Sequence, residues 1–246
     1  MCFAPNQRGV AMYRLVLAIS AVFFFFAPPR IGAQTAARDE NAPSAPVQPG
    51  GTSKDRLFFT LPNFLTLENA PHVPPLTARE KFKVTLQSSF DPGDMLWYAS
   101  TAGLNQAQNS ESGYGQGSKG YAKRFGANFA DGTTENLMTE AIFPSLLHQD
   151  PRYFQLGKGG LRRRTRYAIS RIFLTRSDAG GTQFNYSEIM GSATAAGIST
   201  FSYHPHADRH FSNALNLWGS ELGFDAFTYL AREFWPDIRR KLRKSK

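Results

Sequence analysis

The sequence predicts an all-α protein, a compact multi-helix bundle preceded by an extended Pro-rich arm. Two segments open with helix-capping patterns, and several long segments show the three- and four-residue spacing of a helix face. The chain is 41% hydrophobic and 13% aromatic, which is enough apolar material for a core. We expect the helical domain to cover residues 77–246.

The first 33 residues are typical of a cleaved signal peptide. Arg8 and Arg14 precede an apolar run over residues 15–27, and Ala33 provides a small residue at the expected cleavage site. The run is short for a membrane span, so an uncleaved anchor is the alternative. Cys2 is the only cysteine and lies in this segment, which excludes a disulfide scaffold from the mature chain. We therefore expect export to the periplasm or an envelope membrane.

Two further segments precede the helical domain. Residues 34–55 are rich in Ala, Pro, Gly, Ser and Gln and have no apolar periodicity, which predicts a disordered linker. Residues 56–76 are apolar but contain four prolines, so they form an extended arm or one short strand and not a long helix.

The first two helices have clear start signals. Thr77 and Glu80 form a capping-box pattern, and the helix behind them is expected to end near Ser89. Asp91 followed by Pro92 predicts the start of a second helix, in which residues 95–110 carry no charge.

Two later helices follow from the same signals. Asn185 and Glu188 predict a second capping box before an uncharged, small-residue segment. The last long helix is expected to start at Asp208 or Ser212 and to be broken by Pro236, with a short basic helix after it.

The segment from Tyr114 to Phe154 is expected to lie at the centre of the bundle. Gly132 and Pro144 predict two helices or one bent helix there. Residues without bulk recur at four-residue spacing, both here and in the later uncharged helix, and such rows let two helices approach closely. The residues expected to form these contacts are Ala122, Gly126, Ala130, Gly191 and Ala195.

Basic residues gather in two places. Loss of three arginines with the leader leaves 25 basic and 19 acidic residues, a net charge of +6, and 13 of the basic residues fall within 158–176 and 239–246. Such clusters suit an anionic membrane surface or an envelope polymer, and export argues against nucleic acid; two solvated faces are the alternative. The candidates are Arg162, Arg163, Arg164, Arg166, Arg239, Arg240 and Lys241.

Two polar clusters are candidates for chemistry. His148, Asp150 and Arg152 could place a base, an acid and an anion clamp together, although a helix end pinned by an Asp–Arg pair explains the same residues. His204, His206 and His210 could hold zinc or copper, although surface histidines near a helix start are the alternative. No phosphate-binding loop or hydrolase motif is found, and no cofactor is expected.

Several runs of this sequence resemble a family of exported bacterial proteins of unassigned function. They include FFTLPNFLTLENA, YGQGSKGYAKRFGANFAD, FPSLLHQDPRYFQLGKG and FNYSEIMGSATAAGIS, and the likeness covers residues 56–242. Members are sometimes joined to an upstream carboxypeptidase-regulatory-like β-sandwich domain, for which residues 34–55 are too few. The resemblance implies an envelope location and supplies no catalytic residues.

Together these observations predict an exported cell-envelope protein that is non-enzymatic and membrane-associated through small-residue helix packing and basic segments. An envelope hydrolase or metal-dependent enzyme using one of the two polar clusters is the alternative. The sequence leaves open whether the chain forms a homo-oligomer.

Overall fold

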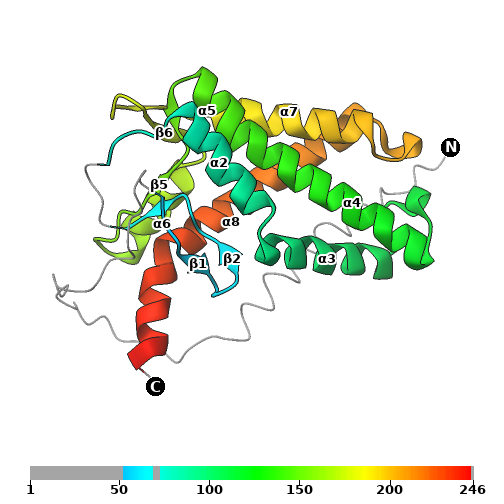
Figure 1. Ribbon diagram of the computed structural model, residues 1–246, viewed down its shortest axis with the longest axis horizontal. Coiled ribbons are helices and arrows are strands. Elements are labelled where there is room, and N and C mark those ends of the chain that lie inside the picture. The colour runs from blue at the N-terminus through cyan, green and yellow to red at the C-terminus, as the bar shows by residue number, and fades with distance from the viewer. Residues whose placement is uncertain (1–51, 69–72, 245–246) are drawn as a thin grey trace. The chain divides into compact units, whose positions relative to one another are not determined.

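The computed structural model describes residues 52–68 and 73–244, all within one unit that spans Ser44–Lys246 (Figure 1). These residues are mainly helical, as the sequence predicts. Three small sheets accompany the helices, so the prediction of an all-α fold was too narrow. The signal peptide predicted over 1–33 and most of the predicted linker lie outside the described residues.

The segment predicted as an extended arm forms short strands. β1 (Arg56–Leu57) pairs antiparallel with β2 (Leu61–Pro62), and β3 (Thr66–Leu67) pairs parallel with β5 (Tyr153–Phe154). Residues 52–55, at the end of the predicted linker, are held to this segment, because the Ser53 N–H donates to the Phe64 carbonyl across 2.8 Å. The folded part of the chain therefore begins before residue 56.

The first two helices start where the caps predict. α2 (Ala78–Ser89) has the full capping box, in which Thr77 and Glu80 satisfy each other's backbone N–H groups. α3 (Pro92–Ala107) begins after Asp91, whose carboxylate accepts from the Gly93 N–H across 2.8 Å. Both predicted starts are confirmed.

The central segment is one continuous helical run after the 3-10 turn η1 (Ser112–Tyr114). α4 (Gly117–Asn136) leads into a π-helical turn, η2 (Leu137–Ile142), and then into α5 (Phe143–Leu146). Gly132 does not interrupt the run; a Cβ there would lie 2.4 Å from the Tyr98 hydroxyl, so its small size is needed for packing against α3. Pro144 also leaves the run unbroken; it directly follows the π-helical turn, as the second residue of α5.

A small sheet and one basic helix follow. β4 (Gln149–Asp150), β6 (Leu174–Ser177) and β7 (Thr182–Phe184) form an antiparallel sheet in the order β4-β6-β7. The basic helix α6 (Leu161–Ser170) precedes β6.

Two long helices complete the chain, α7 (Tyr186–Ser202) and α8 (Phe211–Lys244), with the 3-10 turn η3 (His206–Asp208) between them. The predicted break at Pro236 is wrong, because α8 continues to Lys244. Near the proline, the Glu233 carbonyl accepts hydrogen bonds from the side chains of Gln155 and Arg164. The carbonyl that Pro236 deprives of its helix donor is the one four residues earlier, on Arg232, so these contacts add hydrogen bonds beside that gap and do not fill it.

Only some of the small residues in the bundle of α3, α4, α7 and α8 make the close helix contacts that the sequence predicts. α4 contacts both α3 and α7, and α7 contacts α8. Small residues allow the closest approach: a Cβ on Gly191 would lie 3.1 Å from the Met138 backbone carbon, and Ala195 is buried. By contrast, Ala122 and Gly126 are exposed and Ala130 is half-buried, and nothing lies within 4 Å of a Cβ built on Gly126. Gly126 and Ala130 of the predicted ridge therefore line an open surface groove, and among the described residues nothing packs closely against Gly126.

Candidate functional site

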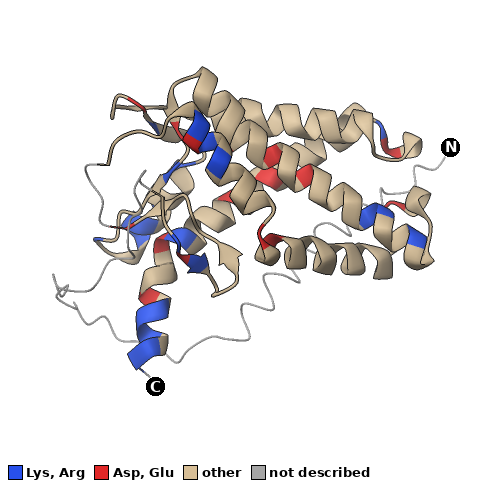
Figure 2. Cartoon of the chain, in the orientation of Figure 1, with Lys and Arg blue, Asp and Glu red and all other residues tan. Residues whose placement is uncertain are grey.

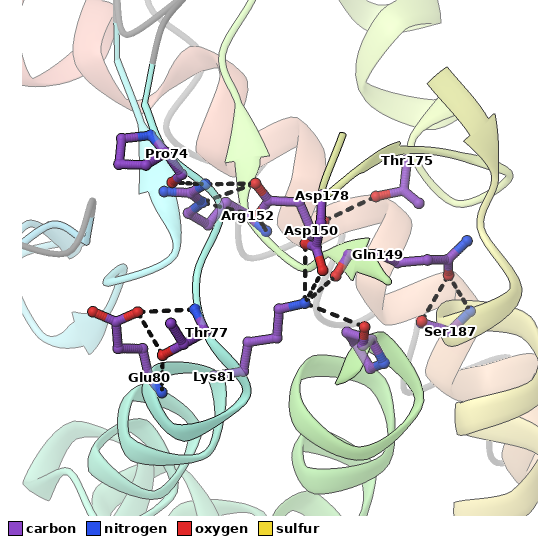
Figure 3. Close-up of polar contacts among 11 residues, drawn as sticks. Pro74, Thr77, Glu80, Lys81, Gln149, Asp150, Arg152, Thr175, Asp178 and Ser187 are labelled. Carbon is purple, nitrogen blue, oxygen red and sulfur yellow. Dashed lines mark hydrogen bonds and ion pairs between the residues drawn. The ribbon is translucent and has the colours of Figure 1, made fainter. Parts of the chain in front are cut away.

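The predicted catalytic cluster is divided between the interior and the surface. Asp150 and Arg152 form a buried ion pair, with Nη2 and Oδ2 2.6 Å apart, and Arg152 also donates to the Pro74 carbonyl (Figure 3). His148, in contrast, is exposed and has a left-handed backbone with φ of 52°. Because the Arg152 guanidinium donates to both carboxylate oxygens of Asp150, the pair supports the turn and leaves no carboxylate free to act as a base.

Lys81 joins this turn to the helices. Its side chain is 1% exposed, and its ammonium donates to the carbonyl of Gln149 (2.8 Å), to the carbonyl of Pro144 (3.2 Å) and to the carboxylate of Asp178 (2.9 Å) (Figure 3). The Gln149 amide oxygen in turn accepts from the backbone and hydroxyl of Ser187. The segment is thus a junction between α2, α5, α7 and the three-stranded sheet.

The predicted metal-binding histidines do not share a site. His204 lies between two carboxylates, with Nδ1 3.1 Å from Glu111 and Nε2 3.4 Å from Asp131. Burial alone would lower the pKa of His204, but these hydrogen bonds outweigh it and raise the pKa to about 10. His206 and His210 are exposed. Among residues 52–68 and 73–244, no three His, Cys, Asp or Glu side chains are arranged to hold a metal ion.

Three of the predicted anion-binding residues have partners within the fold. Arg164 is buried and pairs with Glu233 at 2.7 Å and with Asp237, so its assignment to an anionic surface was wrong. Arg239 likewise pairs with Asp55 and Glu68, two residues of the N-terminal segment. The third, Arg240, is half-exposed and pairs with Asp237. In the sequence these arginines have basic neighbours. The acidic partners of Arg164 and Arg239 lie elsewhere in the chain, so the local sequence does not indicate those ion pairs.

The other basic residues remain at the surface near one end of α8. α6 packs beside the last third of α8 through Arg164, and Figure 2 shows basic positions on both helices in this part of the fold. Apolar side chains stand among them, with Leu161 71% and Leu242 49% exposed. We call this surface the basic end; its exposed cations are Arg162, Arg163, Arg166, Lys241, Arg243 and Lys244.

A set of carboxyl groups inside the bundle was missed by the sequence reasoning. α3, α4, η2, α7 and α8 each contribute at least one, and Figure 2 shows acidic positions gathered where α4 and α8 run past each other. The carboxyl group of Asp225 lies close enough to those of Glu135 and Glu188 to share a proton with either when one of the pair is protonated. The Tyr229 hydroxyl also lies 3.2 Å from Glu188. We call this set the carboxyl cluster: Asp94, Glu135, Glu140, Glu188, Glu221 and Asp225.

Burial is the main cause of raised pKa values throughout the carboxyl cluster. It raises the pKa of Asp94 and of Glu140 to about 7 and that of Glu221 to about 8. The pKa values of Glu135, Glu188 and Asp225 are also raised, by burial and, for the two glutamates, by the charge of Asp225. Arg232 opposes the shift at Glu140 and Asp225. The cluster therefore retains protons at neutral pH.

The sequence does carry a signal for this cluster. Asp94 is the only charged residue of α3, and Glu188 is the only one of α7. A lone carboxyl group on an otherwise uncharged helix usually faces polar partners inside a bundle. Recognising the cluster would have required knowing which helices are neighbours.

No helix of the described residues is both long and apolar enough to cross a membrane. Comparisons of the chain with protein-family models, with curated proteins and with solved structures find no match.

Proposed function

We propose that this chain is an exported, non-enzymatic protein of the cell envelope that docks on an anionic membrane surface through its basic end. The observation that carries the proposal is the set of exposed cations contributed by α6 and by the last turns of α8. The leader predicted from the sequence supports the envelope location.

The composition of the basic end fits a lipid surface. Each lysine or arginine near an anionic membrane contributes about 1 kcal/mol of attraction. Leu161 and Leu242 add apolar surface beside these cations, and apolar contact strengthens binding at the lipid interface.

Close helix contacts give this surface a firm support. The small-residue contacts at Gly132 and Gly191 hold the bundle together, and the buried pair of Arg164 and Glu233 fixes α6 on α8. The alternative of an enzyme gains no such support. His148 is exposed whereas Asp150 and Arg152 are buried, and His204, His206 and His210 do not form a metal-binding set among the described residues.

Vesicle co-sedimentation of the full chain tests the proposal. The variant Arg162→Glu/Arg163→Glu removes positive charge from the basic end, and Lys119→Glu/Lys123→Glu makes the same change of charge at exposed positions of α4. We expect the first variant to bind phosphatidylglycerol-containing vesicles more than tenfold more weakly than wild type, given about 1 kcal/mol for each basic side chain. The second should bind nearly as well as wild type.

The leader is common to all three proteins, so any binding it contributes cancels in the comparison. Equal weakening by both variants would show that only net charge matters and would refute docking through the basic end. Equal binding of wild type to phosphatidylglycerol and phosphatidylcholine vesicles would refute recognition of an anionic surface.

A further inference from the structure

We infer that the outward faces of α3, α7 and the first half of α8 contact the acyl chains of the membrane. This inference rests on the proposed function and extends it from the basic end to the sides of the bundle. In a water-soluble bundle, apolar side chains usually lie inside and charged side chains outside. Here the arrangement is reversed: carboxyl groups lie inside, and large apolar side chains lie on the outer faces of these helices.

α7 shows the reversal most clearly. Its exposed large side chains are all uncharged, and Met190 and Phe201 have 49% and 48% of their surface exposed. Its one charged residue, Glu188, is buried, together with a row of serines and alanines. A helix on the surface of a water-soluble bundle has the opposite arrangement.

α3 and the first half of α8 repeat the pattern. Leu96 and Leu104 on α3 are 60% and 49% exposed, whereas Asp94 is turned toward the carboxyl cluster. On α8, no charged residue is exposed from Phe211 to Phe227. The large apolar side chains exposed there are Phe211, Leu215, Phe224 and Phe227.

The positions of these faces distinguish lipid from a single protein partner. In Figure 1, α7 runs along one side of α4 and α3 along the other, and α4 contacts both. Apolar faces on opposite sides of a bundle are not covered by one symmetric interface, which buries a single patch on each copy. A surrounding apolar phase covers both.

The interior and the basic end agree with this environment. The raised pKa values of Asp94, Glu140 and Glu221 leave part of the carboxyl cluster protonated at neutral pH, which lowers the charge inside the bundle, and polar groups within a membrane face the bundle interior. α8 carries an uncharged outer face over 211–227 and exposed cations at 241–244, so one helix offers both acyl-chain and headgroup contacts.

Single-cysteine labelling tests the inference directly, because Cys2 is the only native cysteine. In a full-length Cys2→Ser background, we would place an environment-sensitive fluorophore at Leu96→Cys on α3 or Met190→Cys on α7. Ala179→Cys, in the exposed turn between β6 and β7, is the control. On phosphatidylglycerol-containing vesicles, we expect blue-shifted emission at both helix positions, at least twofold quenching there by lipids with a spin label on the acyl chain, and neither effect at the control.

The possible results separate the two proposals. If the labelled chain sediments with anionic vesicles but neither helix position is quenched, the basic end docks and the inference fails. If the emission of the fluorophore at one helix position changes with protein concentration in the absence of vesicles, a second copy covers that face and the inference fails there. If the chain does not sediment with the vesicles at all, the proposed function itself fails.

Discussion

Tyr153 and Glu233 are 80 residues apart in the chain and are joined by a hydrogen bond, in which the Tyr153 hydroxyl donates to Oε2 across 2.7 Å. The same carboxylate accepts the backbone N–H groups of Leu156 and Gly157, each at 3.0 Å, and the guanidinium of Arg164. It is fully buried. One side chain of α8 therefore fixes both the loop after β5 and the helix that carries half of the basic end.

Replacing this carboxylate should destabilise the fold strongly. Glu233→Gln substitutes a donor for one acceptor and leaves Arg164 with only the partly exposed Asp237 as an ionic partner, so we expect the free energy of unfolding to fall by roughly 3 kcal/mol in urea denaturation. Arg240→Gln is the control, because its ion pair with Asp237 is half-exposed and should contribute less than about 0.5 kcal/mol. Similar small losses in both variants would contradict the role given to Glu233.

The carboxyl cluster should make stability depend on pH. Its raised pKa values mean that the folded chain binds more protons than the unfolded chain above about pH 4.5, so the free energy of unfolding should fall as the pH rises toward about 8. We expect a loss of a few kcal/mol between about pH 5.5 and pH 8.5, measured by urea denaturation. Glu221→Gln should reduce this dependence. Stability that is constant or increases over the interval would show that the cluster does not hold protons.

Two glycines should respond in opposite ways to the same substitution. Gly191→Ala would place a methyl group 3.1 Å from the Met138 backbone, so we expect a loss of roughly 1–3 kcal/mol through overpacking. Gly126→Ala adds a methyl group in open space within α4 and should stabilise the helix by about 1 kcal/mol. Thermal unfolding compares the two, and a loss at Gly126 would mean that another surface packs there.

Two lysines on α2 allow a matched comparison of a buried and an exposed ammonium group. Lys81→Met removes a buried ammonium that holds two backbone carbonyls and Asp178, so we expect destabilisation of roughly 2–4 kcal/mol. Lys83→Met, two residues along the same helix, changes an exposed side chain and should alter stability by less than about 0.5 kcal/mol. Chemical denaturation of both variants measures the difference; equal stabilities would show that the ammonium is not needed at the junction.

Local chemistry accounts for the parts of the fold that the sequence predicts well. The starts of α2 and α3 depend on caps within a few residues of Thr77 and Asp91, and both are where the sequence places them. The break expected at Pro236 is absent, and Gln155 and Arg164, both more than 65 residues away, donate to the Glu233 carbonyl near it. Such long-range contacts cannot be read from local sequence.

The site residues show the same limit. Arg162 and Arg164 are identical in type and two residues apart, yet the first is exposed and the second is buried against Glu233. Glu140 lies eight residues before His148 in the sequence, yet it belongs to the carboxyl cluster. Which charges meet inside the fold depends on how α4, α7 and α8 cross, and helical periodicity alone does not determine this.

The most direct test of membrane docking is flotation of the full chain with vesicles of increasing anionic lipid content, at about 0.1 M and about 1 M salt. We predict that the bound fraction at low salt rises with the anionic fraction and that high salt, present before mixing, suppresses this rise. Binding that is the same on neutral and anionic vesicles at both salt concentrations, or no binding to either, would contradict docking through the basic end.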